Sequence, residues 1–218
     1  MNQAWSELNK TMQAQIKKKD TCEAGIDTLF DLRNQLMETL TSFSEELSRE
    51  EFDAIPFINA DGYHSKTIAY SIWHIFRIED IVAHTLIGED EQVFFAGNYQ
   101  ERINSPIITT GNELVKEQIA DFSKQLNLKE LYAYIFEVKD STEKIIDSLS
   151  YDDLKKKISE ERKEYLKSLN VVSNDENAIW LIDYWCGKDI RGLIQMPFSR
   201  HWIMHIEASQ RIKNRIHS

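Results

Sequence analysis

The feature that most constrains this chain is its scarcity of chain-breaking residues: only 7 glycines and 3 prolines occur among 218 residues. So few breakers favour long helices over many short strands joined by tight turns. Apolar residues also recur three and four positions apart, as in the stripe of Trp5, Leu8, Met12 and Ile16, which is the spacing of one helix face. We therefore expect an all-α fold.

Four long stretches carry this helical pattern and are expected to form an antiparallel four-helix bundle with additional short helices. They cover residues 25–47, 65–87, 128–149 and 198–216. The second stretch is apolar over more than one stripe, so we expect it to be the most buried helix. We expect one domain over residues 1–218, in which residues 1–24 form an N-terminal helical extension.

The segments between these helices are shorter or interrupted. Residues 89–112 predict a loop-rich excursion with one short helical piece, and residues 159–173 predict an irregular link. Residues 173–195 begin with the capping-box pattern Ser173-x-x-Glu176. Two glycines interrupt that last segment, so it is expected to form a weak or broken helix.

The composition argues against several classes of function. The formal net charge of −10 disfavours a general nucleic-acid binder, because phosphate contacts need clustered cations. The most apolar stretch, residues 67–87, is interrupted by charged residues, so we expect no membrane span. Cys22 and Cys186 lie outside any C-x-x-C motif and are expected to be free thiols in a reducing compartment. With no signal-peptide pattern at the N-terminus, the sequence predicts a cytoplasmic protein.

The segment FSRHWIMHIE, residues 198–207, places His201 and His205 four positions apart. Six histidines in this length give about 0.17 such pairs by chance, so the spacing alone proves little. On a helical wheel the two rings lie only about 40° apart, in the middle of the apolar face. Buried imidazoles are costly without partners, so this pair is expected to meet a partner in the core.

The same wheel places His74 on the inward face of the helix expected over residues 65–87. Two helices would then direct imidazoles into one interior. Three histidines with an open coordination position form the ligand set of a catalytic-type zinc or nickel centre, with water completing the shell. The alternative is that His74 is an isolated core histidine and that the pair lies at a hydrated helix end.

Other residues carry weaker signals. Arg77 projects from the side of the helix that carries His74 and is a candidate contact for an anionic substrate group; the alternative is a salt bridge to Asp80 or to another carboxylate of the bundle. His84 is expected at the rim of the apolar face, on the surface or behind the ligands. No E-x-x-H motif occurs, which disfavours a di-iron carboxylate bundle. H-E-x-x-H, a Gly-rich phosphate loop and G-x-S-x-G are also absent from the sequence.

The segments TIAYSIWHIFRIED and MPFSRHWIMHIEASQRI together resemble the DinB/YfiT-like superfamily of metalloenzymes. Members are four-helix bundles with one histidine on the second helix and an H-x-x-x-H on the fourth. The likeness covers nearly the whole chain in helix order, although the N-terminal helix and the two long connections depart from the short members. By this resemblance His74 corresponds to the ligand of the second helix, and His201 and His205 correspond to the pair on the fourth.

The resemblance implies one divalent ion, zinc or nickel, with solvent at the open position, and members are often homodimers. Characterised relatives include transferases and isomerases that use small bacterial thiols. The expectation is therefore a metal-dependent enzyme, thiol S-transferase-like or hydrolase-like, that acts on a small electrophile with a low-molecular-weight thiol as a candidate co-substrate. The competing hypotheses are a non-catalytic metal-binding bundle, for stress-related binding or sensing, and an interaction scaffold without metal.

Overall fold

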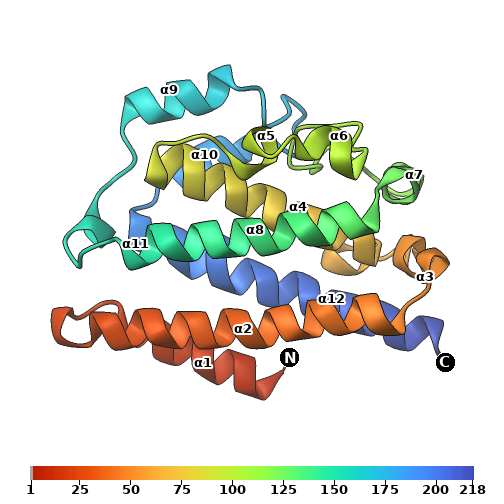
Figure 1. The fold of residues 1–218 in the computed structure, drawn as a ribbon, viewed down its shortest axis with the longest axis horizontal. Helices are drawn as coiled ribbons and strands as arrows, with labels where there is room; N and C mark the ends of the chain where they lie inside the picture. The colour runs from red at the N-terminus through yellow and green to blue at the C-terminus, as the bar shows by residue number, and fades with distance from the viewer. Residues whose placement is uncertain (1) are drawn as a thin grey trace.

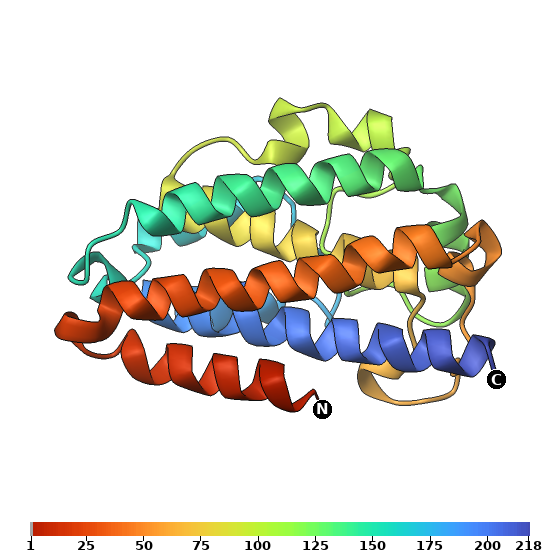
Figure 2. The same ribbon diagram turned by 60° about the horizontal axis from the view of Figure 1, so that its bottom comes forward.

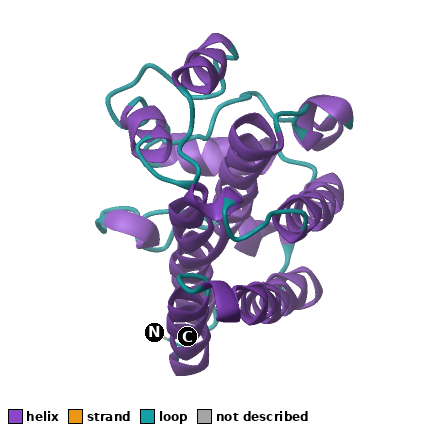
Figure 3. Cartoon of the chain, turned by 90° about the vertical axis from the view of Figure 1, so that its left-hand side faces the viewer, coloured by secondary structure: helices purple, strands orange, loops and turns teal. Residues whose placement is uncertain are grey.

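The structure, a computed structural model, describes residues 2–218, and the named elements in that range are all helical (Figure 3). Four long helices form a bundle. They are α2 (Cys22–Glu46), α4 (Ile68–Asp80, continued by a π-helical segment over Ile81–Gly88), α8 (Leu128–Asp147) and α12 (His201–Ile216). The expected all-α fold, built around four long helices, is confirmed.

The four helices form a ring in which α2 lies beside α12, α12 beside α4, α4 beside α8, and α8 beside α2 (Figure 1). The pairs α4–α12 and α2–α8 run antiparallel, as expected. The other two pairs run parallel. In α2–α12, for example, Arg33 contacts the carbonyl of Phe198 early in both segments, and Phe43 lies 5.8 Å from Lys213 Nζ late in both. The antiparallel arrangement thus holds for two of the four neighbouring pairs.

Long connections make the parallel pairs possible, because a parallel neighbour requires the chain to return along the bundle. After α4 the chain runs back over the outside of the bundle (Figure 1). Its short helices there are α5 (Val93–Ala96), α6 (Tyr99–Ile103) and α7 (Glu117–Gln125). α8 consequently begins at the end of the bundle where α4 begins.

The connection between α8 and α12 folds into a cover made of short helices. They are a 3₁₀ turn over Asp153–Lys155, α9 (Glu160–Ser168), α10 (Trp180–Cys186), α11 (Ile190–Gln195) and a π-helical turn over Met196–Arg200. α9 packs against the π-helical continuation of α4, and α10 packs on α9. α11 leads directly into the turn that starts α12.

Two expectations about this cover were wrong. The link over residues 159–173 is not irregular, because the Ser159 hydroxyl accepts a hydrogen bond from the Arg162 backbone N–H and caps α9. The capping box at Ser173 does not form; its hydroxyl accepts from the nearer Asp175 N–H at 3.2 Å, which makes a local turn. The helix therefore begins only at Trp180.

α4 is the helix at the centre of the molecule, with every residue from Ile68 to Asp80 buried, charged ones included. Glu79 receives two hydrogen bonds from Arg33 of α2, at 2.7 and 3.0 Å, and one from the indole of Trp202 on α12, at 2.8 Å. Burial alone would leave such a carboxylate very unstable. Arg33 Nε also donates to Glu143 of α8 at 2.9 Å. This cluster therefore ties all four long helices together at one level and fixes the position of α12 along α4.

The remaining elements lie at the edges of the bundle. α1 packs along α2, and the chain termini lie on the same side of the molecule (Figure 2). The bounds of these elements are α1 (Gln3–Gln15), a 3₁₀ turn over Lys19–Thr21, α3 (Arg49–Asp53) and a 3₁₀ turn over Gly62–His64. Among the described residues, none of the helices combines the length and apolar character that a bilayer crossing requires.

Candidate metal centre

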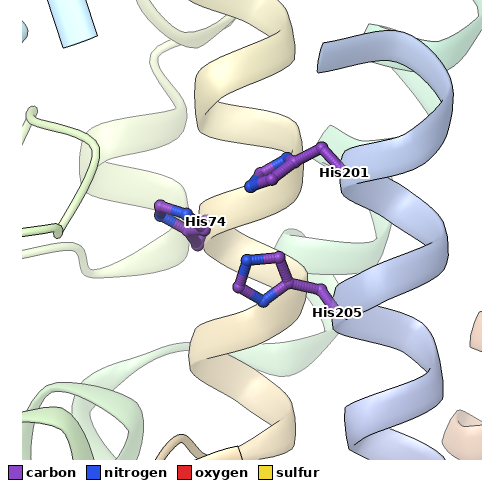
Figure 4. Close-up of side chains that lie close together, drawn as sticks. All are labelled: His74, His201 and His205. Atoms are coloured by element: carbon purple, nitrogen blue, oxygen red, sulfur yellow. The ribbon is translucent and has the colours of Figure 1, made fainter. Parts of the chain in front are cut away.

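The three predicted histidines meet in the interior between α4 and α12. His74 comes from α4, and His201 and His205 come from the first two turns of α12 (Figure 4). All three are buried, and one nitrogen of each ring lies within 4.8 Å of the others. The ring centroids are 5.1 Å apart for His74–His201, 4.8 Å for His74–His205 and 4.6 Å for His201–His205. The helical-wheel placement of the three rings is thus what the structure shows.

Local structure explains why the rings meet. His201 and His205 are one helical turn apart, so their side chains project in nearly the same direction. Trp202, directly after His201, is held to Glu79 of α4 by its indole N–H. That bond sets the axial position of α12, and the two α12 histidines consequently lie level with His74.

His74 is held in one tautomer and one orientation. Its Nδ1 lies 2.7 Å from the backbone carbonyl of Thr110, which can only accept, so Nδ1 carries the proton. Tyr70 stacks on the ring at 5.4 Å and donates to the carbonyl of Gly111 at 2.9 Å. Gly111 has φ +75°, and a Cβ there would lie 3.1 Å from the Tyr70 ring. The loop thus presents a carbonyl to His74 that leaves Nε2 free as a donor atom for a metal.

The environment keeps all three imidazoles neutral. Burial lowers the pKa of His74 to about 4, with the nearby charge of Lys66 acting in the same direction and the Thr110 bond opposing it. Burial and the neighbouring histidines hold the pKa values of His201 and His205 well below the usual range. Neutral imidazole is the form that binds a metal. This chemistry suits a divalent cation.

Two buried nitrogens in the group have no hydrogen-bond partner among residues 2–218. They are Nδ1 of His201 and Nδ1 of His205, and an unpaired buried polar atom costs free energy.

Two zinc–nitrogen bonds of about 2.1 Å span at most about 4.2 Å, so nitrogens no more than 4.8 Å apart reach one ion through small side-chain rotations. The group therefore fits a single metal ion.

A cavity of about 240 Å³ opens beside the three histidines. Its other lining residues are mostly aromatic or apolar and come from the cover, from the Gly62–His64 turn, from the loop after Gly111 and from α4. They are Tyr63, Ile78, Asn112, Trp180, Leu181, Tyr184, Trp185, Met196 and Pro197. A small molecule in this cavity would contact the imidazole group directly.

Arg77, the candidate substrate contact, lies elsewhere. Its side chain is fully buried and does not line the cavity. Its Nε donates to the carbonyl of Ile108 at 2.9 Å, and Nη2 donates to Gln92 at 2.7 Å. Nη1 lies 3.5 Å from Asp80, the salt bridge named as the alternative. With these partners engaged, Arg77 anchors the 89–112 excursion to α4 instead of meeting a substrate.

His84 is buried, not at the surface rim as expected. Its Nδ1 lies 2.7 Å from Asp90 and its Nε2 lies 2.9 Å from the Ser141 hydroxyl, remote from the three-histidine group. The helical wheel correctly placed His84 near the edge of the apolar face of its helix, but α8 and the loop that contains Asp90 cover that edge. His64 and His217 bond to Arg211 and Glu51 and do not join the group.

Tyr63 and Asn112 are two of the cavity residues that sequence reasoning missed. The Tyr63 ring lies 4.7 Å from that of His205, and the buried Oδ1 of Asn112 has no hydrogen-bond partner. Both lie in connections with no periodic pattern, so no sequence signal gives their direction.

No protein-family model and no curated protein matches the chain.

Proposed function

We propose that this chain is a metal-dependent enzyme in which His74, His201 and His205 hold one divalent ion, zinc or nickel. The observation that carries the proposal is the convergence of three buried, neutral imidazoles at the wall of a cavity. Three nitrogen donors leave a coordination position for water or substrate, as catalytic sites require. The resemblance to the DinB/YfiT-like superfamily supports the same three residues.

The chain's own residues have distinct roles in this proposal. His74, oriented by Thr110, would provide the fixed donor, and the two histidines of α12 would complete the set of three nitrogen ligands. A divalent ion there would supply Lewis acidity, which lowers the pKa of a thiol or of a water molecule. The aromatic walls would contact the apolar part of a substrate, and the unpaired Oδ1 of Asn112 would accept a hydrogen bond from it.

We further propose a thiol S-transferase-like or hydrolase-like reaction on a small electrophile. The cavity supports catalysis over a non-catalytic metal site, because a purely structural zinc site is closed by four protein ligands and needs no adjoining space. A cavity of about 240 Å³ suits a small molecule rather than a polymer.

Elemental analysis of the purified protein tests the metal, and turnover assays test the reaction. We expect about one equivalent of zinc or nickel in the wild type and far less in His201→Ala. Conjugation of cysteine to 1-chloro-2,4-dinitrobenzene and hydrolysis of 4-nitrophenyl acetate should depend on the ion and decline in the variant. Equal turnover by metal-loaded and chelator-treated wild type would refute an enzymatic role, while full metal content in His201→Ala would refute the site.

A further inference from the structure

The cavity beside the three histidines differs from the rest of the molecule in charge. The chain carries 36 acidic residues against 26 lysines and arginines, yet none of the cavity-lining residues is a carboxylate. No carboxylate contributes to the pKa of His74, His201 or His205 either. A divalent ion on three neutral donors would thus have no negative charge from the protein beside it.

Two cations lie near this cavity without a carboxylate partner among the described residues. Lys66 Nζ lies 5.2 Å from the ring of Tyr70, which in turn stacks on His74. Its positive charge helps to lower the pKa of His74 and of His205, and burial lowers the pKa of Lys66 itself. Lysine is almost never buried without a partner, so a half-buried lysine that forms no ion pair is unusual.

Arg200 is the second cation. It is exposed on the π-helical turn immediately before His201. The same turn contributes Met196 and Pro197 to the cavity wall, and His201, the next residue, also lines the cavity. Lys66 and Arg200 thus place two positive charges near the cavity, while the nearby carboxylate Glu113 acts on Tyr70.

The mouth of the cavity is aromatic. Trp180 is 49% exposed and Tyr63 is 37% exposed, values that are high for such large apolar rings. The Trp180 indole N–H donates to the carbonyl of Asn177 in its own segment, so the indole is fixed while its surface stays open. Tyr184 meets Trp180 edge to face at 5.6 Å and lines the same cavity. These rings form a preformed apolar contact surface for a planar ligand.

We propose that the cavity binds small aromatic anions: Lys66 and Arg200 attract the negative group toward the three histidines, and Trp180 and Tyr184 pack against the aromatic body. The position of the negative group beside a metal ion rests on the proposed function. The preference for anions and for an aromatic body rests on the protein's own side chains and exists without the ion.

Calorimetric titration with three matched probes tests this preference: phenylacetate, 2-phenylethylamine and acetate. Phenylacetate should bind at least about fivefold more tightly than either of the others to the metal-free protein, and the advantage over the amine should grow when zinc is added. Equal or tighter binding of 2-phenylethylamine to the metal-free protein would overturn the charge assignment. Equal binding of acetate and phenylacetate would overturn the proposed preference for an aromatic body.

Substitutions at single positions identify the side chains that are responsible for phenylacetate binding. Lys66→Gln should weaken phenylacetate binding about three- to fivefold without changing metal content, whereas Lys66→Arg keeps the charge and should keep the affinity. Trp180→Ala should weaken binding about fivefold, and the matched control Ile179→Ala, also exposed on this segment but not lining the cavity, should not. Unchanged affinity in both Lys66→Gln and Trp180→Ala would refute the proposal.

The same experiments separate this inference from the proposed function. A protein that takes up no zinc or nickel contradicts the metal centre, but its preference among the three probes still decides whether the cavity selects aromatic anions. A protein that binds metal and shows no such preference retains the metal centre and loses the ligand class.

Discussion

At the scale of single residues, His74 differs from its two partners in how its ring is held. Its Nδ1 proton is donated to the carbonyl of Thr110, the kind of bond that orients metal-binding histidines and raises their basicity. Nδ1 of His201 and Nδ1 of His205 have no protein acceptor. In the proposed metal centre, His74 would therefore be the preset ligand and the two α12 rings would adjust on binding.

The first prediction at this scale concerns ligand identity. His205→Asn should weaken zinc affinity by more than about 100-fold, because loss of a mere supporting partner already costs 10- to 100-fold. His64→Asn is the control: its ring follows Tyr63 in the turn by the cavity but bonds to Arg211, so zinc affinity should stay within a factor of about two. Competition with a chromophoric chelator measures both. Similar losses in the two variants would contradict the assignment of the three ligands.

The sequence placed the three histidines in one interior because helix periodicity gives the direction of a side chain. It misplaced Arg77 for a related reason: the wheel shows the face from which a side chain leaves, but not which partner a long, flexible side chain reaches. Gln92 and the carbonyl of Ile108 lie in the excursion, whose path no local pattern gives. Tyr63 and Asn112 escaped notice because their segments have no period at all.

At the scale of elements, the buried ion pair between Arg33 and Glu79 fixes the position of α2 relative to α4. Arg33 Nη2 lies 2.7 Å from Glu79 Oε1, with both side chains fully buried, and the guanidinium also stacks on Trp202 at 4.4 Å. Burial raises the pKa of Glu79, and the charge and hydrogen bonds of Arg33 counteract that rise. The pair joins α2 to α4 at the level where Trp202 fixes α12, only three residues from His205.

We predict that Arg33→Met destabilises the protein by about 3–5 kcal/mol, because Glu79 is left as an uncompensated buried charge. The matched control is Arg102→Met: Arg102 makes an ion pair of the same length, 2.7 Å, with Glu130, but at the surface, so its loss should cost less than about 1 kcal/mol. Urea unfolding followed by circular dichroism measures both. Equal losses of unfolding free energy in the two variants would show that burial does not determine how much these ion pairs stabilise the protein.

At the scale of the whole molecule, the sequence predicted where the long helices occur. It did not predict which neighbouring helices run parallel and which run antiparallel. The four long helices appear where apolar periodicity placed them, with ends shifted by a few residues. Their mixed parallel and antiparallel order depends on whether the connections return along the bundle, which is decided by tertiary packing of short helices such as α7 and α9. Both helices have only 9 residues, and α9 is too polar to show a clear apolar period, as the misread link over residues 159–173 illustrates.

The buried histidines also make the stability of the metal-free protein depend on pH. The unfolded chain protonates its histidines near pH 6.5, whereas the folded protein does not protonate His74 until about pH 4. Between these values the unfolded state binds more protons, so the contribution to stability is fully present above pH 6.5 and is lost as the pH falls toward 4.

For His74 alone the loss should total about 3 kcal/mol across that window. Burial holds the pKa values of His201 and His205 well below the usual range, so they add to the loss in the same direction. Urea unfolding of chelator-treated protein at pH 7, 6 and 5 measures the slope, and a His201→Gln/His205→Gln variant should show a shallower one over the same range. Restricting the comparison to pH 5 and above limits the contribution of carboxylates. Identical slopes for the wild type and the double variant would mean that these imidazoles are protonated as readily in the folded protein as in the unfolded chain.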